Sequence, residues 1–119
     1  MGKDGMVTVW WKKTCTSAKK GVAHLRERGV EFELRDIVKD PPPRELLEAN
    51  LDEGNLKAAV NTRSKPYREL GLKAGLPPKA KLIDLMLEHP DLIRRPVVAK
   101  GGRASFGPDP AAIDAVIDG

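Results

Sequence analysis

The sequence predicts an α/β fold with a small four-stranded mixed sheet, flanked by helices and carrying a helical insertion between strands two and three. Segments 6–10 and 30–34 alternate apolar and polar residues, as half-buried strands do. A helical stretch separates them, and a strand, crossover helix and strand of this length form a parallel pair. Near the end of the chain, two apolar runs flank Gly101-Gly102, a dipeptide typical of a tight hairpin. These patterns together predict parallel and antiparallel pairing in one sheet.

The helices are predicted by apolar periodicity and by residues that favour helix ends. Ala18, Val22 and Leu25 recur at spacings of four and three, which indicates a helix from about Cys15 to Arg28. The stretch 41–90 holds leucine-rich stripes broken by prolines and glycines, which predicts several short helices.

The last helix is expected to begin after Asp109, a favourable N-cap, with Pro110 in its first turn. We therefore expect a single domain over 1–119, with a core of about 6–38 and 94–118 and a helical insertion of about 41–90.

Composition argues against several functional classes. One cysteine excludes an internal disulfide, and the only histidines are His24 and His89, so we expect no metal site and no bound cofactor. His24 lies on the basic face of the first helix and is expected to be exposed. The net charge of +4 comes from interspersed charges, and two Trp, one Tyr and two Phe are too few for a base-stacking surface. No apolar run could span a bilayer, and 1–6 lacks the apolar core of a signal peptide. We expect a cytoplasmic protein that contacts neither membrane nor nucleic acid directly.

Cys15 is the strongest candidate for a reactive group. It lies between the first strand and the first helix, where unpaired backbone N–H groups and the helix dipole stabilise a thiolate. Thr16 and Ser17 follow it and either donate hydrogen bonds to the sulfur or cap the helix. A buried structural cysteine is the alternative, since free cysteines are among the most buried residues.

Four segments resemble one family. The segment 13–20 around Cys15 is similar to the active-site turn of the arsenate reductase-like family, which includes glutaredoxin-linked arsenate reductases and Spx-type transcriptional regulators (ArsC/Spx). The Thr-Arg-Ser-Lys run within 61–67, the segment 89–98 and the pair Phe106-Gly107 resemble the family in the same order. The resemblance extends from about residue 7 to the end of the chain.

The resemblance implies a thioredoxin-like fold, a catalytic Cys15, and an Arg95-Pro96 bond that is cis, with Pro96 beside the cysteine. It also implies that Arg63 and Arg95 bind an anion, and we expect Thr16 and Ser17, which follow the cysteine, to contribute to the same site. From spacing alone both arginines would be surface or ion-paired residues, and Arg94 is expected to be solvated or paired with an acidic neighbour.

The chain departs from the family pattern at two positions. Many members carry a second cysteine where this chain has Ala18, so a redox cycle here needs an external thiol such as glutathione or glutaredoxin. The arsenate enzymes carry a third arginine where this chain has Gly107, so we expect inefficient arsenate reduction. The first hypothesis is therefore a monothiol reductase acting on a small anionic substrate; the alternative is a regulator-like module that binds RNA polymerase or another protein without turnover.

Overall fold

A computed structural model describes residues 6–119. The first five residues, where the sequence predicts no signal peptide, lie outside the described residues. Across 6–119, the helices are all too short or too polar to traverse a bilayer.

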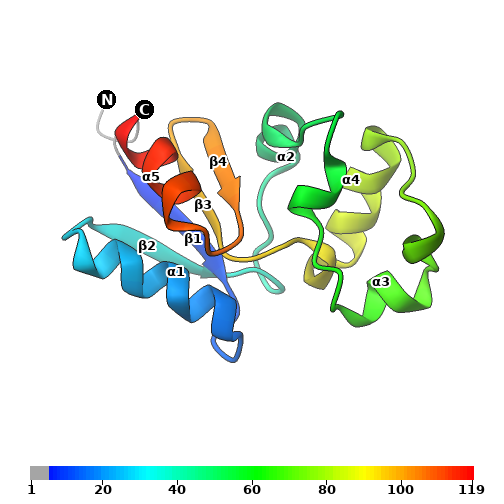
Figure 1. Ribbon diagram of the computed structural model, residues 1–119, viewed down its shortest axis with the longest axis horizontal. Coiled ribbons are helices and arrows are strands. Elements are labelled where there is room, and N and C mark those ends of the chain that lie inside the picture. Colours follow the sequence, from blue (N-terminus) through cyan, green and yellow to red (C-terminus); the bar gives the residue numbers. More distant parts are fainter. Residues whose placement is uncertain (1–5) are drawn as a thin grey trace.

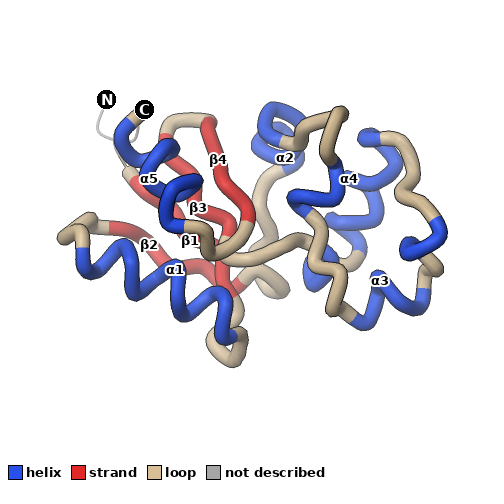
Figure 2. The backbone as a smooth tube through the Cα atoms, viewed as in Figure 1, coloured by secondary structure: helices blue, strands red, loops and turns tan. Residues whose placement is uncertain are grey.

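The sheet has four strands in the order β2-β1-β3-β4, as Figure 2 shows in red. β1 (Val7–Trp11) pairs in parallel with β2 (Phe32–Asp36) and antiparallel with β3 (Val97–Lys100), which pairs antiparallel with β4 (Arg103–Phe106). The predicted four-stranded mixed sheet is confirmed. At the hairpin, Gly101 and Gly102 have φ of 58° and 87°, and this left-handed conformation suits glycine.

The second strand begins later than the alternation predicts. Val30 donates its N–H to the carbonyl of Leu25 (3.1 Å), and Gly29 has φ of 69°. These two residues close the end of the preceding helix, so Val30 is not available to the sheet. The strand instead continues to Asp36.

Two helices cover one face of the sheet. α1 (Thr16–Glu27) and α5 (Pro110–Asp118) pack there, as Figure 1 shows on its left side. Val9 and Val98 of the sheet lie in one apolar cluster with Leu25 of α1 and Ile113 of α5. Asp109 accepts a hydrogen bond from the N–H of Ala111 (3.2 Å) and caps α5, as its sequence position predicts.

The insertion supplies the core of the opposite side. Its elements are α2 (Arg44–Asn50), η2 (Leu56–Ala59), α3 (Lys65–Glu69), η3 (Leu72–Ala74), α4 (Lys79–Glu88) and η4 (Pro90–Leu92). Trp10 and Val97 point away from the α1–α5 side and share a second apolar cluster with Leu47 and Met86 of the insertion. The sheet therefore has helices on both faces, and the insertion forms the right half of Figure 1. Its junction with the sheet is where the candidate site lies.

Candidate active site

Cys15 is held at the start of α1 by the chain that leaves β1. The N–H of Cys15 donates to the carbonyl of Lys12 (2.9 Å) and closes a turn directly after the strand. Cys15 is itself the N-cap residue of α1, with extended backbone (φ −91°, ψ 121°). Ala18 and Leu25 are fully buried and fix the helix on the sheet. The thiol therefore sits where the first N–H groups of the helix are unpaired.

The surroundings of Cys15 favour the thiolate. Partial burial by itself raises the pKa of the Cys15 thiol, but hydrogen bonds from the N–H of Ala18 and from the Arg95 side chain act against it, as do the charge of Arg95 and the N–H of Ser17. The net effect is a pKa below the usual cysteine value. At neutral pH the site thus holds more of the nucleophilic form than an ordinary thiol would.

Arg95 reaches Cys15 from the loop before β3. Its side chain is 13% exposed, and Nη1 donates to Oδ1 of Asp91 (3.1 Å). Lys12 Nζ also lies 3.2 Å from the same Asp91 oxygen. Asp91 thus orients two cations from different parts of the chain and partly neutralises both. Nε of Arg95 is buried, and within 6–119 nothing pairs with it.

The Arg95-Pro96 peptide is cis, as the resemblance implies. The ring of Pro96 lies against α1 at Gly21: a Cβ built on Gly21 would be 2.5 Å from Pro96 Cγ. Because Gly21 has no side chain, the helix carrying Cys15 can approach the loop carrying Arg95 this closely.

Arg63 comes to the site through pairing between two distant segments. Val60 and Ile93 form an antiparallel bridge, flanked by hydrogen bonds from Asn61 N–H to the Leu92 carbonyl (2.8 Å) and from Arg94 N–H to the Ala59 carbonyl (2.9 Å). This pairing aligns 59–61 with 92–94. The loop that follows carries Arg63.

Local hydrogen bonds make that loop rigid. Asn61 accepts the N–H of Arg63 on Oδ1 (3.2 Å) and donates from Nδ2 to the carbonyl of Asp91 (3.2 Å). The hydroxyl of Ser64 accepts the N–H of Tyr67 (3.3 Å) and caps α3. The Thr-Arg-Ser-Lys run is therefore a turn fixed to the loop that also carries Arg95.

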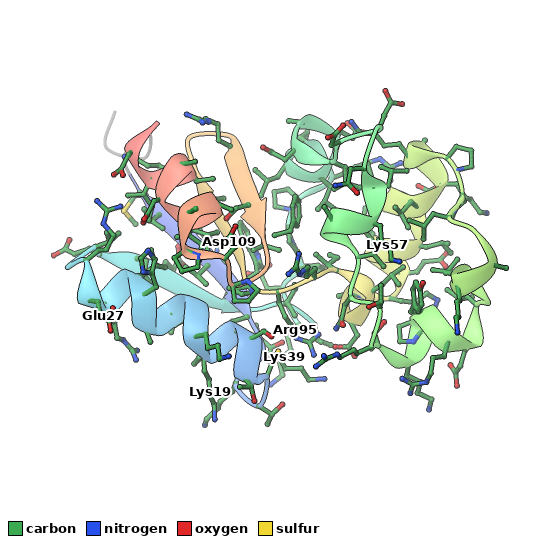
Figure 3. All side chains as sticks on the ribbon, viewed as in Figure 1. Lys19, Glu27, Lys39, Lys57, Arg95 and Asp109 are labelled. Carbon is green, nitrogen blue, oxygen red and sulfur yellow. The ribbon has the colours of Figure 1, made fainter. Side chains whose placement is uncertain are left out.

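Two adjoining pockets meet at Cys15, with volumes of about 360 Å³ and 440 Å³. The predicted site residues Cys15, Ser17, Arg63 and Arg95 line both, whereas Thr16 lines only the second, beside Lys12 and Asp91. The backbone N–H of Ser17 is among the groups that lower the pKa of the Cys15 thiol, and hydrogen bonds from the Thr16 and Ser17 hydroxyls stay a prediction. Figure 3 shows Arg95 at the junction of sheet and insertion.

The first pocket also contains residues that were not predicted as site residues, two cations among them. Lys57, Asn61 and Arg94 line it with the predicted residues. Arg94 is exposed, as expected, but it pairs with no carboxylate within 6–119. Its guanidinium lies against Gly107, where a Cβ would be 2.7 Å from Cζ. No acidic residue lines this pocket, so it is strongly positive.

The histidines lie elsewhere. His24 is 20% exposed, and its Nε2 is 2.7 Å from Oδ1 of Asp114 on α5, so it is not the solvated residue that its helix face predicts. His89 lies near Glu88. Among the described residues, no three His, Cys, Asp or Glu side chains are grouped to hold a metal ion.

Comparison with known proteins places this geometry in a family. The model of the ArsC family matches residues 10–116. The chain is 34% identical over 115 residues to an arsenate reductase of Rhizobium meliloti, covering 94% of this chain and 82% of that protein. It belongs to the ArsC family.

Other ArsC-family relatives carry a different description. The chain is 33% identical over 104 residues to the global transcriptional regulator Spx of Enterococcus faecalis, covering 86% of this chain and 79% of the regulator. Among solved structures, an ArsC family related protein from Bacteroides fragilis, described as putative, superposes with a TM-score of 0.81 at 26% identity, covering 92% of this chain and 96% of that one. The chain is therefore similar both to a protein named as an arsenate reductase and to one named as a transcriptional regulator, and it shares the thioredoxin-like ArsC fold.

Proposed function

We propose that this ArsC-family protein is a monothiol reductase in which Cys15 is the nucleophile and an external thiol completes the cycle. The observation that carries the proposal is the lowered pKa of Cys15 beside Arg95, in a pocket open to an anion. A thiolate is the form that attacks disulfides, and a lowered pKa raises its fraction at neutral pH.

The absence of a second cysteine determines the form of the cycle. Ala18 occupies the position three residues after Cys15 and is fully buried, and the sequence holds no other thiol. A mixed disulfide formed on Cys15 therefore has to be resolved by another molecule. Glutathione and glutaredoxin are the donors that fit this requirement.

The cycle balances in two exchanges. The Cys15 thiolate attacks one sulfur of a disulfide, the S–S bond breaks, and the other half leaves as a thiolate that takes up a proton. A donor thiolate then attacks the mixed disulfide on the sulfur not belonging to Cys15, and Cys15 leaves as its thiolate. One half of the substrate is released as a thiol, and the other half leaves joined to the donor as a new disulfide. A second donor thiol that attacks this disulfide releases the retained half, so two donor thiols together supply the two electrons that reduce the substrate.

Arg63 and Arg95 have the role of binding the negative charge of the substrate. Guanidinium groups pair bidentately with carboxylates and oxyanions, so two of them in one pocket orient an anionic substrate over the sulfur. Arsenate is only one candidate substrate among several, because Gly107 stands where the arsenate enzymes carry a third arginine.

Mass spectrometry after exposure to oxidised glutathione tests the proposal. We expect one glutathione adduct, located on Cys15, that reduced glutathione or glutaredoxin removes. The Cys15→Ser variant is the matched control and should gain no mass. An unmodified protein after prolonged exposure, or an adduct that no thiol removes, would contradict the proposal.

A regulator-like role is the second candidate, and similarity to Spx is the observation in its favour. Such a module binds RNA polymerase and needs no turnover. Affinity purification with tagged protein decides this: recovery of polymerase subunits with both the parent and Cys15→Ser would favour the regulator, and their absence would exclude it.

A further inference from the structure

The positive pocket at Cys15 continues into a second basic pocket on the insertion. That second pocket has a volume of about 540 Å³ and is lined by Lys57, Thr62, Tyr67, Arg68 and Lys73. Lys57 and Thr62 also line the Cys15 pocket, so the two adjoin along this pair of residues. The site is therefore longer than the immediate surroundings of the sulfur.

The charge of this extension is uncompensated. Neither pocket is lined by a carboxylate, and within 6–119 Lys57, Arg68 and Lys73 form no ion pair. Other cations of the chain do find acidic partners: Arg28 pairs with Asp118 (3.0 Å) and Arg44 with Asp84 (2.8 Å).

The extension is attached to the same loop that carries Arg63. Nη1 of Arg68 donates to the carbonyl of Arg63 (2.9 Å), and Lys57 lies in η2 directly before the Val60–Ile93 bridge. Figure 3 shows Lys57 on the insertion, away from Arg95 at the sheet junction. Lys57 and Arg68 are thus fixed in position relative to the loop that carries Arg63.

The joined pockets are larger than a small inorganic ion needs. Each has a volume within the range of about 300–1,000 Å³ that is usual for organic ligands. A molecule with its reacting sulfur at Cys15 and a carboxylate beyond Lys57 would have to be elongated. A peptide of three extended residues spans about 10 Å and is elongated in this sense.

We propose that Lys57, Arg68 and Lys73 form a distal anion subsite, and that the substrate is an elongated acidic disulfide whose carboxylate lies there while its sulfur meets Cys15. This inference rests on the proposed function, since it assigns the substrate class of the same cysteine. It adds a selectivity that the cysteine and its two predicted arginines do not provide.

Three disulfide probes test the subsite: oxidised glutathione, which is elongated and anionic, hydroxyethyl disulfide, which is uncharged, and cystamine, which is cationic. The rate of Cys15 modification is measured with each by mass spectrometry. We expect oxidised glutathione to react fastest and cystamine slowest, with the difference shrinking as salt is added.

Variants of the distal lysines separate this subsite from the arginines near Cys15. Lys57→Ala and Lys73→Ala should each slow the reaction with oxidised glutathione by about twofold to fivefold, the range for one exposed ion pair. Lys73→Ala, which lies outside the Cys15 pocket, should leave the reaction with hydroxyethyl disulfide unchanged. Lys73→Glu should have the larger effect and should speed the reaction with cystamine. Lys81→Ala, an exposed lysine of α4 outside both pockets, is the matched control. Arg68 is not substituted, because its side chain also donates a hydrogen bond to the carbonyl of Arg63.

The outcomes distinguish the two proposals. If all three probes modify the parent at one rate, or if Lys73→Glu alters the rates with oxidised glutathione and hydroxyethyl disulfide equally, the distal subsite is wrong and the monothiol mechanism stands. If no probe modifies Cys15 in the parent, both fail.

Discussion

The guanidinium of Arg94 lies across Gly107, so closely that a Cβ on Gly107 would be 2.7 Å from Arg94 Cζ and Nε. Gly107 also donates its N–H to the carbonyl of Pro96 (3.0 Å) and has φ of 99°. The position thus lacks a side chain for two reasons, the backbone conformation and the space that Arg94 occupies.

Gly107→Ala should displace Arg94 from the pocket. Because the clash is with the mobile end of a long side chain, the cost in stability comes mainly from the left-handed backbone, about 1–2 kcal/mol. Gly102→Ala is the matched control, with φ of 87° and nothing within 4 Å of the added carbon. We expect similar losses in urea unfolding for both variants, but slower reaction of Cys15 with oxidised glutathione only in Gly107→Ala. Equal reaction rates would show that Arg94 does not act on the substrate.

Arg95→Ala should raise the pKa of Cys15. The Arg95 side chain donates a hydrogen bond to the sulfur and adds its charge, and both effects lower the pKa of that thiol. The ultraviolet absorbance of the thiolate, followed against pH, measures the change. Alkylation at neutral pH should slow and then match the parent at alkaline pH, where both thiols are ionised. Arg26→Ala, about 16 Å along α1 at 1.5 Å per residue, is the control and should titrate as the parent does.

Gly21→Ala should destabilise the fold although it lies inside a helix. Glycine to alanine in a helix ordinarily gains up to about 1 kcal/mol, but here the new carbon would be 2.5 Å from Pro96 Cγ in a buried ring that cannot swing away. Overpacking of this kind costs about 1–3 kcal/mol, so a net loss is expected in urea unfolding. Gly75→Ala, where nothing lies within 4 Å, should be tolerated. A stabilised Gly21→Ala protein would contradict the close approach of helix and loop.

Asp114 makes the stability of the fold depend on pH in the acid range. The hydrogen bond with His24, followed by that with Arg28, holds the pKa of the Asp114 carboxyl below its usual value. A lowered carboxyl pKa stabilises the fold above the unfolded-state pKa of about 4, and the contribution is lost as the pH falls through the lower folded-state pKa. Asp114→Asn should therefore lower stability at neutral pH, with the deficit disappearing below about pH 4.

Urea unfolding at several pH values measures this deficit. The control is Glu53→Gln, an exposed carboxyl for which no ion pair is recorded within 6–119. It should show no comparable pH dependence. A deficit for Asp114→Asn that persists unchanged in acid would mean that the carboxylate charge is not what joins α1 to α5.

The sheet and the position of Cys15 could be predicted because their signals are local. Alternation marks β1, the Gly101-Gly102 pair marks the hairpin, and the junction of strand and helix places Cys15. The start of β2 was predicted two residues early because the alternation includes Val30. The N–H of Val30 instead donates to the carbonyl of Leu25 at the end of α1. Helix ends and strand starts compete for the same backbone groups, and the pattern of side chains does not decide that competition.

The rest of the site depends on pairing that no local pattern encodes. Arg63 and Arg95 were identified by resemblance, but Lys57 and Arg94 enter the pocket because 59–61 pairs with 92–94. His24 was expected on an open helix face and instead meets Asp114, because α5 packs beside α1. Both outcomes follow from contacts between segments far apart in the chain.

The short pairing of Val60 with Ile93 also joins two parts of the chain that have different proposed roles. In the proposed mechanism the reactive group is Cys15, which the sheet and α1 hold, whereas the distal cations belong to the insertion. Drift or deliberate redesign within 56–73 could thus retune which molecules the protein accepts while the sulfur chemistry stays constant. A single scaffold of this kind is well suited to acquiring new specificities, since the cations proposed to select the substrate and the cysteine proposed to react with it lie on different parts of the chain.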